Sequence, residues 1–266
     1  MRIVVCVKAV PGSTEVKMDP KTNTIVRDGG QAVINPFDAS ALEVALQIKD
    51  NFAELPGDVR VTVVSMGIPA TEGLLRDCIA RGADEAILLT DRAFAGADTL
   101  ATAYALKCGI DAIGGAFDMI VCGKMAVDGD TAQIGPELAA AYDVPCVTDV
   151  SLIRDVRADQ EVVVVHATDE GSETVCVPEP AVITVSKDIA QLRMPSIAGI
   201  KRAESAKVRV LSAADAGADP ARCGLAGSPT QVVRSFVPER NDTCTRIEGT
   251  VPEQAAALVK LFEEVA

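Results

Sequence analysis

The stretch FDMIVCGKMAVDGDTAQIGPELAAAY (117–142) combines three local patterns in one unit. It opens with an apolar run of strand length, continues as a loop that contains glycines, and ends in an alanine-rich segment that favours a helix. Pro136 lacks an amide hydrogen and is best tolerated in a first helical turn, so the helix should begin within a few residues before it. The stretch therefore predicts a strand–loop–helix unit of an α/β fold.

The same alternation of strand and helix patterns runs back to the N-terminus. The short β-branched runs are RIVVCV (2–7), VRVTVVSM (59–66), EAILLT (85–90) and DMIVCG (118–123). The helical patterns between them are ASALEVALQIKDNF (39–52), ATEGLLRDCIARG (70–82) and TLATAYALKCGIDAIGG (99–115). Asp38 and Asp98 stand where helix N-caps are expected, and Gly82 stands where a helix should end. This order predicts a doubly wound, mostly parallel Rossmann-like sheet.

The pattern changes after residue 145. Four further strand-like runs follow, VTDVSLIRDV (147–156), QEVVVVHATD (160–169), ETVCVP (173–178) and AVITVS (181–186), and at least two of them should pair antiparallel. TEVKMDPKTNTIVR (14–27) predicts a hairpin inserted after the first strand. Regular signals fade from about residue 190, yet 200–250 is too apolar for a solvated linker. We therefore expect an arm that lies on another subunit, followed by a helix over 253–265.

Composition excludes several classes of protein. The 266 residues carry a net charge of −13, which disfavours nucleic-acid binding and adhesion to an anionic membrane. Eight cysteines without a C-x-x-C pair indicate reduced thiols rather than disulfides or a zinc site. The first apolar run is too short for a secretory signal, and no run approaches the length of a membrane span. We expect a cytoplasmic protein without membrane insertion.

The loops contain neither of the standard phosphate motifs, G-x-G-x-x-G and G-x-x-x-x-G-K-[ST]. The single histidine gives no catalytic triad, and we expect no metal site. Backbone amides remain the candidate donors, because Gly123, Gly129 and Gly135 permit close approach and a helix N-terminus attracts a pyrophosphate. Asp128 and Asp130 would then cap the helix or shape the loop. The alternative is a purely structural turn with Asp130 as the cap.

Six segments together resemble the beta (small) subunit of electron transfer flavoproteins, in the same order along the chain. They are IVVCVKAVPGSTEVKMDP (3–20), NPFDASALEVAL (35–46), RGADEAILL (81–89), AVDGDTAQIGPELA (126–139), RMPSIAGI (193–200) and GLAGSPTQV (224–232). The resemblance implies a heterodimer with a larger alpha subunit that carries a redox FAD. It also implies a nucleotide-binding Rossmann-like domain over 1–195, and an arm with a terminal helix over 196–266 that packs on the alpha subunit.

The resemblance also implies which residues line the nucleotide site, largely through backbone contacts. Carried over by position, they are Cys6, Val7, Lys8, Asn35, Pro36, Phe37, Asp38, Met66, Gly123, Lys124, Met125, Ala126, Val127, Asp128, Gly129, Asp130, Thr131, Ala132, Gln133, Ile134, Gly135 and Pro136. In members that hold a second flavin, the loop DRAFAGADTLAT (91–102) lies against it, which adds Asp98, Thr99 and Thr102. No catalytic side chain is implied, because the redox chemistry belongs to the cofactor.

The amino-acid sequence of the loop separates two subgroups of that family. DGDTAQIGP (128–136) resembles the electron-bifurcating members, which hold FAD, whereas members that hold AMP tend to read N-Q-T-G-Q. Bifurcation would take a hydride from NADH, send one electron to ferredoxin or flavodoxin, and send the other through the alpha-subunit FAD to an acyl-CoA dehydrogenase. A non-bifurcating beta subunit with a structural AMP is the first alternative. A stand-alone adenine-nucleotide-binding sensor on the same fold is the second.

Overall fold

The computed structural model describes residues 1–12, 32–51, 58–157, 161–233, 244 and 246–265. Nine strands form one sheet in the order β11-β5-β4-β1-β6-β10-β7-β8-β9. Their bounds are β1 Arg2–Cys6, β4 Arg60–Met66, β5 Glu85–Leu89, β6 Met119–Gly123, β7 Cys146–Arg157, β8 Glu161–Thr168, β9 Gly171–Pro178, β10 Ala181–Val185 and β11 Arg209–Leu211. A second sheet pairs β2 (Ala9–Pro11) with β3 (Ala32–Ile34). The predicted hairpin over 14–27 lies outside the described residues.

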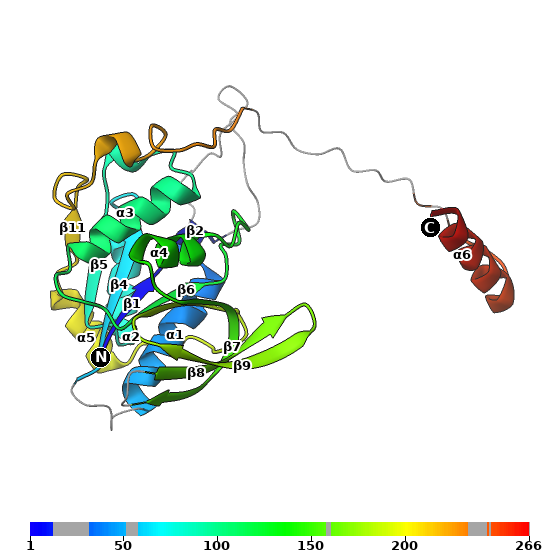
Figure 1. Ribbon diagram of the computed structural model, residues 1–266, viewed down its shortest axis with the longest axis horizontal. Helices are drawn as coiled ribbons and strands as arrows, with labels where there is room; N and C mark the ends of the chain where they lie inside the picture. Colours follow the sequence, from blue (N-terminus) through cyan, green and yellow to red (C-terminus); the bar gives the residue numbers. More distant parts are fainter. Residues whose placement is uncertain (13–31, 52–57, 158–160, 234–243, 245, 266) are drawn as a thin grey trace.

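The main sheet is parallel from β11 to β7, and β7, β8 and β9 form an antiparallel extension at one edge (Figure 1). The strand β10 returns between β6 and β7 after this extension, so the antiparallel strands are an insertion in a doubly wound sheet. The predicted fold class, an α/β Rossmann-like sheet with an antiparallel insertion, is therefore confirmed.

Helices cover both faces of the sheet. The helices are α1 Pro36–Asn51, α2 Thr71–Arg81, α3 Thr99–Asp111, α4 Ile134–Tyr142, α5 Ile197–Ser205 and α6 Val251–Val265, with 3-10 turns η1 Arg92–Phe94 and η2 Pro220–Arg222. Residues of α1, α2 and α5 belong to one buried apolar cluster, and residues of α3 and α4 belong to another. Side chains of β1 alternate between them, because Ile3 and Val5 face the first cluster and Val4 and Cys6 face the second.

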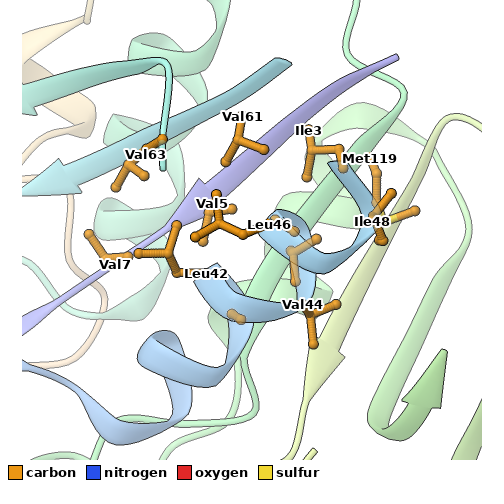
Figure 2. Close-up of a cluster of buried hydrophobic side chains, with 14 of the residues drawn as sticks. Ile3, Val5, Val7, Leu42, Val44, Leu46, Ile48, Val61, Val63 and Met119 are labelled. Carbon is orange, nitrogen blue, oxygen red and sulfur yellow. The ribbon is translucent and has the colours of Figure 1, made fainter. Parts of the chain in front are cut away.

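The α1 side of the core is built from aliphatic side chains. Figure 2 shows Leu42 and Leu46 of α1 against Val5 of β1, with Val61 and Val63 of β4 beside them. All of these side chains are fully or almost fully buried. A chain with 3% aromatic residues fills its core in this way, since branched aliphatic side chains pack tightly between a parallel sheet and its helices.

Two of the three predicted helix boundaries are confirmed. The Asp98 carboxylate accepts a hydrogen bond from the Ala101 amide at the start of α3, and Gly82 ends α2 with φ 139°. The predicted N-cap at Asp38 is wrong, because α1 begins at Pro36 and Asp38 lies within its first turn. Proline is preorganised for the first helical position, and this moves the start of the helix ahead of the aspartate.

The segment after residue 190 contains elements that the sequence patterns did not indicate. The helix α5 packs on α2, and a Cβ atom added at Gly199 would lie 2.0 Å from the Ala80 carbonyl oxygen. The Arg76 guanidinium closes this contact by donating to the Ala203 and Ala206 carbonyls at 3.1 and 2.6 Å. The strand β11 then pairs with β5 at the edge of the sheet. These elements are short, so tertiary contacts decide them.

The C-terminal helix α6 stands apart from the sheet domain (Figure 1). Its apolar side chains Leu258, Val259, Leu261 and Phe262 are exposed. The predicted contact of this region with a partner subunit stays a prediction. None of the helices in the described ranges has the length and apolar character needed to cross a membrane.

Replacing Leu46 by alanine tests the core in Figure 2. Because Leu46 is 1% exposed, Leu46→Ala should lower the free energy of unfolding by about 2–5 kcal/mol, through lost burial and a residual cavity. Leu100→Ala on α3, where the side chain is 53% exposed, is the matched control and should change it by less than about 0.5 kcal/mol. Urea unfolding measures both, and equal losses would contradict this account of the core.

Candidate functional site

The carboxyl ends of β1, β4 and β6 meet at one edge of the sheet, where doubly wound folds bind ligands. The loop after β6 covers residues 124–133 and leads into α4. The strand β2 follows β1 directly, so the small β2–β3 sheet starts at this same edge. Cys6, Met66 and Gly123 end the three strands, and the structure thereby brings these predicted site residues together.

Asp38 connects the loops after β1 and β6. Its carboxylate accepts hydrogen bonds from the Lys8 amide at 2.8 Å and from the Gly123 amide at 3.2 Å. Gly123 has to be glycine at this contact, since an added Cβ would lie 2.4 Å from the Asp38 Oδ1 atom. The first turn of α1 therefore fixes where both strands end.

Asn35, the residue before α1, holds the loop after β6. Its amide nitrogen donates to the Met125 carbonyl at 2.9 Å, and its amide oxygen accepts from the Val127 amide at 3.1 Å. Asn35 is fully buried, so both polar groups of its side chain find backbone partners rather than water. Asn35 and Asp38 thus shape the backbone at the predicted site.

Burial raises the pKa of Asp38 to about 7, and hydrogen bonds from the amides of Lys8 and Gly123 and from Asn35 partly offset this rise. The carboxylate is 7% exposed, and removal from water penalises its charged form. The link between the two loops therefore includes a group that titrates near neutral pH.

The loop itself has an unusual backbone. Asp130 and Ala132 have positive φ values of 47° and 54°, in the left-handed region that alanine seldom adopts. The amides of Gly129 and Asp130 both donate to the Ala126 carbonyl and close a turn. Asp128 pairs with the Lys8 ammonium at 2.5 Å, so this carboxylate ties the loop to the end of β1.

Neither loop aspartate caps α4. The residue before the helix is Gln133, and its side chain makes no capping hydrogen bond. The suggested cap at Asp130 is therefore wrong, since the helix begins four residues further on at Ile134. The expectation that α4 starts shortly before Pro136 is confirmed.

Five consecutive backbone amides, those of residues 131–135, have no hydrogen-bond acceptor within the described part of the chain. Pro136 follows them and has no amide hydrogen to satisfy. Unpaired amides at a helix N-terminus, reinforced by the helix dipole, attract anions such as phosphates. The donor set therefore fits the phosphates of a nucleotide. Such a site requires free backbone amides, and these can be present without a G-x-G-x-x-G motif.

Other predicted residues have contacts of their own within the described structure. The Lys124 ammonium lies 2.6 Å from the Asp149 carboxylate, and the Val7 amide donates to the Val64 carbonyl. Met66 is half-buried at the end of β4, and Phe37 is buried. Thr102 lies one turn into α3, where its amide donates to the Asp98 carbonyl. Which of these residues touch a nucleotide stays a prediction.

The structure adds Glu137 and Thr184, which the sequence analysis did not select. The Thr99 hydroxyl lies 3.0 Å from a Glu137 carboxylate oxygen, and burial raises the pKa of Glu137. Thr184 contacts Gly135 so closely that a Cβ there would lie 2.2 Å from the threonine methyl group. Glu137 directly follows the proline of the predicted first turn, and this position was the only available signal.

Among the described residues, no group of three or more His, Cys, Asp or Glu side chains could hold a metal ion. The fold and the amide cluster define a doubly wound α/β protein whose loop at the carboxyl edge of the sheet has the donor set that an anion requires. Proteins of this class bind nucleotides at that edge.

Comparison with known proteins identifies the family. The profile described as "Electron transfer flavoprotein domain" matches residues 22–216. The chain is 43% identical to the caffeyl-CoA reductase-Etf complex subunit CarD of Acetobacterium woodii, covering 99% of this chain and 98% of the relative. It is 42% identical to the electron transfer flavoprotein subunit beta of Thermoanaerobacterium thermosaccharolyticum, covering 98% and 97%, respectively. It is 41% identical to protein FixA of Bradyrhizobium diazoefficiens, covering 97% and 90%. The chain belongs to the electron transfer flavoprotein beta-subunit family.

The pKa of Asp38 predicts how stability changes with pH. Because the folded pKa is raised above its ordinary value of 3.8, the contribution of this group is complete below about pH 4 and is lost as pH rises through about 7. Asp38→Asn removes this titration. The free energy of unfolding of the wild type, relative to Asp38→Asn, should therefore fall by roughly 1.4 kcal/mol per pH unit between pH 5 and 7. Urea unfolding at pH 5, 6, 7 and 8 measures this, and parallel curves would contradict it.

Proposed function

We propose that this chain is the beta subunit of a heterodimeric electron transfer flavoprotein and binds FAD at the loop over 123–136. The observation that carries the proposal is the row of five amides over 131–135, which have no acceptor among the described residues and lie at the carboxyl edge of a doubly wound sheet. A phosphate needs several donors in a fixed arrangement. This row of amides provides them, and no side-chain entropy is lost in ordering them.

The chain's own residues would bind and orient the nucleotide. The amides before α4 would donate hydrogen bonds to the phosphates, and the Lys8 ammonium, which pairs with Asp128, lies at the same edge. The contacts of Asn35 and Asp38 keep the loop in shape before a ligand arrives, and this lowers the entropy lost on binding. A bound FAD would supply the redox chemistry, which no side chain of this site performs.

The amino-acid sequence of the loop favours FAD over AMP. Residues 128–136 read DGDTAQIGP, which resembles the bifurcating subgroup of the family. A relative of 43% identity is named as a subunit of a caffeyl-CoA reductase-Etf complex, and this name supports an enzyme that acts on an acyl-CoA thioester as a partner. We therefore propose the alpha subunit and an acyl-CoA dehydrogenase as partners, NADH as the electron donor, and ferredoxin or flavodoxin as the low-potential acceptor.

Counting the nucleotides in the purified heterodimer tests the cofactor. The chain co-expressed with its alpha subunit should yield two FAD per heterodimer, because each subunit would hold one. Acid extraction followed by chromatography measures FAD and AMP separately. One FAD and one AMP would overturn the FAD assignment and leave a non-bifurcating beta subunit. A folded monomer that carries an adenine nucleotide and does not bind the alpha subunit would favour the sensor.

Gly129→Val tests the loop as the nucleotide site. A Cβ at Gly129 meets no atom within 4 Å, so the valine fits the folded chain and projects into the open space beside the loop. We expect loss of the beta-site nucleotide with the alpha-subunit flavin retained, as measured by nucleotide content per heterodimer. Gly73→Val in α2 is the matched control, since its added Cβ also meets no atom within 4 Å. Equal flavin loss at both sites would indicate misfolding and contradict the prediction.

A further inference from the structure

We infer that Asp98 and Ser228 are positioning residues that couple the segment 224–230 to the amides of the nucleotide loop. The inference rests on the proposed function, because it takes those amides to hold a nucleotide. Among the described residues, the segment 224–230 is the last one before α6 that is hydrogen-bonded to the sheet domain. Fixing this segment and filling the loop would then favour each other.

Both oxygens of the Asp98 carboxylate are occupied by the chain itself. Oδ1 accepts from the Ala101 amide at 3.0 Å and caps α3, and Oδ2 accepts from the Thr230 amide at 3.0 Å. The Asp98 amide donates to the Ser228 hydroxyl at 2.8 Å. These bonds hold the pKa of Asp98 below its ordinary value, against the effect of burial. Asp98 therefore joins α3 to the segment 224–230 and need not touch a ligand to act.

Ser228 is the buried half of this junction. It is 7% exposed, and its hydroxyl donates to the Gly224 carbonyl at 2.7 Å while it accepts from Asp98. Gly224 has a positive φ of 53°, and an added Cβ would lie 2.2 Å from the Ala93 carbonyl oxygen. The Leu225 amide donates to the Ala95 carbonyl at 3.0 Å. The segment thus lies tightly on the loop before α3, whereas Val232 and Val233 beyond it are exposed.

Thr99 carries the connection from α3 to the nucleotide loop. Its hydroxyl lies 3.1 Å from the Gln133 Oε1 atom and 3.0 Å from the Glu137 Oε1 atom. Gln133 contributes one of the five unpartnered amides, and Glu137 lies in the first turn of α4. The Thr99 hydroxyl is the donor in both contacts, so its single hydrogen is shared between these two oxygens or alternates between them. Burial raises the pKa of Glu137 above its ordinary value, while the hydrogen bond from Thr99 lowers it.

A continuous path of contacts therefore leads from Thr230 and Ser228 through Asp98 and Thr99 to the amides before α4. A displacement of segment 224–230 would release the start of α3, and with it the contact of Thr99 with Gln133. Coupling of this kind is reciprocal, so a nucleotide held by the amides should also hold the segment. The C-terminal region continues from this segment. Its docking on a partner would therefore change the affinity of the loop for a nucleotide.

The test compares Ser228→Ala with a matched serine elsewhere. The full chain in its heterodimer, freed of beta-site nucleotide, is titrated with ADP by calorimetry. Hydrogen exchange of residues 224–233 is followed with and without ADP. We expect ADP to slow exchange in 224–230 of the wild type. Ser228→Ala should weaken ADP binding about fivefold and reduce that protection. Ser212→Ala also removes a hydroxyl that both donates and accepts, to and from Asp215 beside β11, and should change neither.

Two further variants separate positioning from a loss of folding. Thr230→Pro removes the amide that donates to Asp98 and should weaken ADP binding in the same direction, with thermal unfolding showing a folded chain. If Ser228 acts through Asp98, the double variant Ser228→Ala, Asp98→Asn should lose no more affinity than the weaker-binding of the two single variants. Wild-type affinity and protection in Ser228→Ala would overturn the coupling while the proposed function stands. A wild-type heterodimer that binds neither ADP, AMP nor FAD at this subunit would overturn the proposed function itself.

Discussion

The buried carboxylate of Asp38 is the interaction on which the functional edge of this protein depends. The strands β1 and β6 must end at defined positions, and the backbone at each end offers one amide, that of Lys8 or of Gly123, to this carboxylate. A side chain with two acceptor oxygens can satisfy both donors, while burial at 7% exposure makes any unsatisfied donor costly. The cost is a carboxylate that is hard to keep charged, and its pKa is accordingly raised to about 7.

A chain with a net charge of −13 is an unexpected host for a phosphate group. The site resolves this conflict locally. Its donors are backbone amides whose partial charges do not depend on composition, and the loop carboxylate of Asp128 is paired with Lys8. Long-range repulsion between exposed charges is screened beyond about 10 Å at moderate ionic strength, whereas contacts to amides are not. Local geometry therefore decides what this edge of the sheet can bind.

Local patterns predicted most of the fold. The runs that became β1, β4, β5 and β6 were visible because buried parallel strands are continuously apolar, and α2 and α3 were delimited by Gly82 and Asp98. Sequence patterns did not predict elements whose residues have only a weak local preference for helix or strand. The helix α5 and the strand β11 depend on the close approach at Gly199, on the Arg76 contacts and on the free edge of β5. No window of sequence contains that information.

The candidate site also combines features that the sequence predicted with features that depend on tertiary contacts. The sequence by itself determined a glycine-bearing loop before a helix with Pro136 in its first turn, because a missing amide hydrogen and a small side chain act within a few residues. Its likeness to the electron transfer flavoproteins was carried by segments spread along the chain and is confirmed by the family comparison. Only the tertiary structure decided the long-range contacts of Asp38, Asn35 and Asp98. Their partners lie between 85 and 132 residues away in the chain, apart from Lys8, Ala101 and the local helix contacts, so only folding brings these donors and acceptors together.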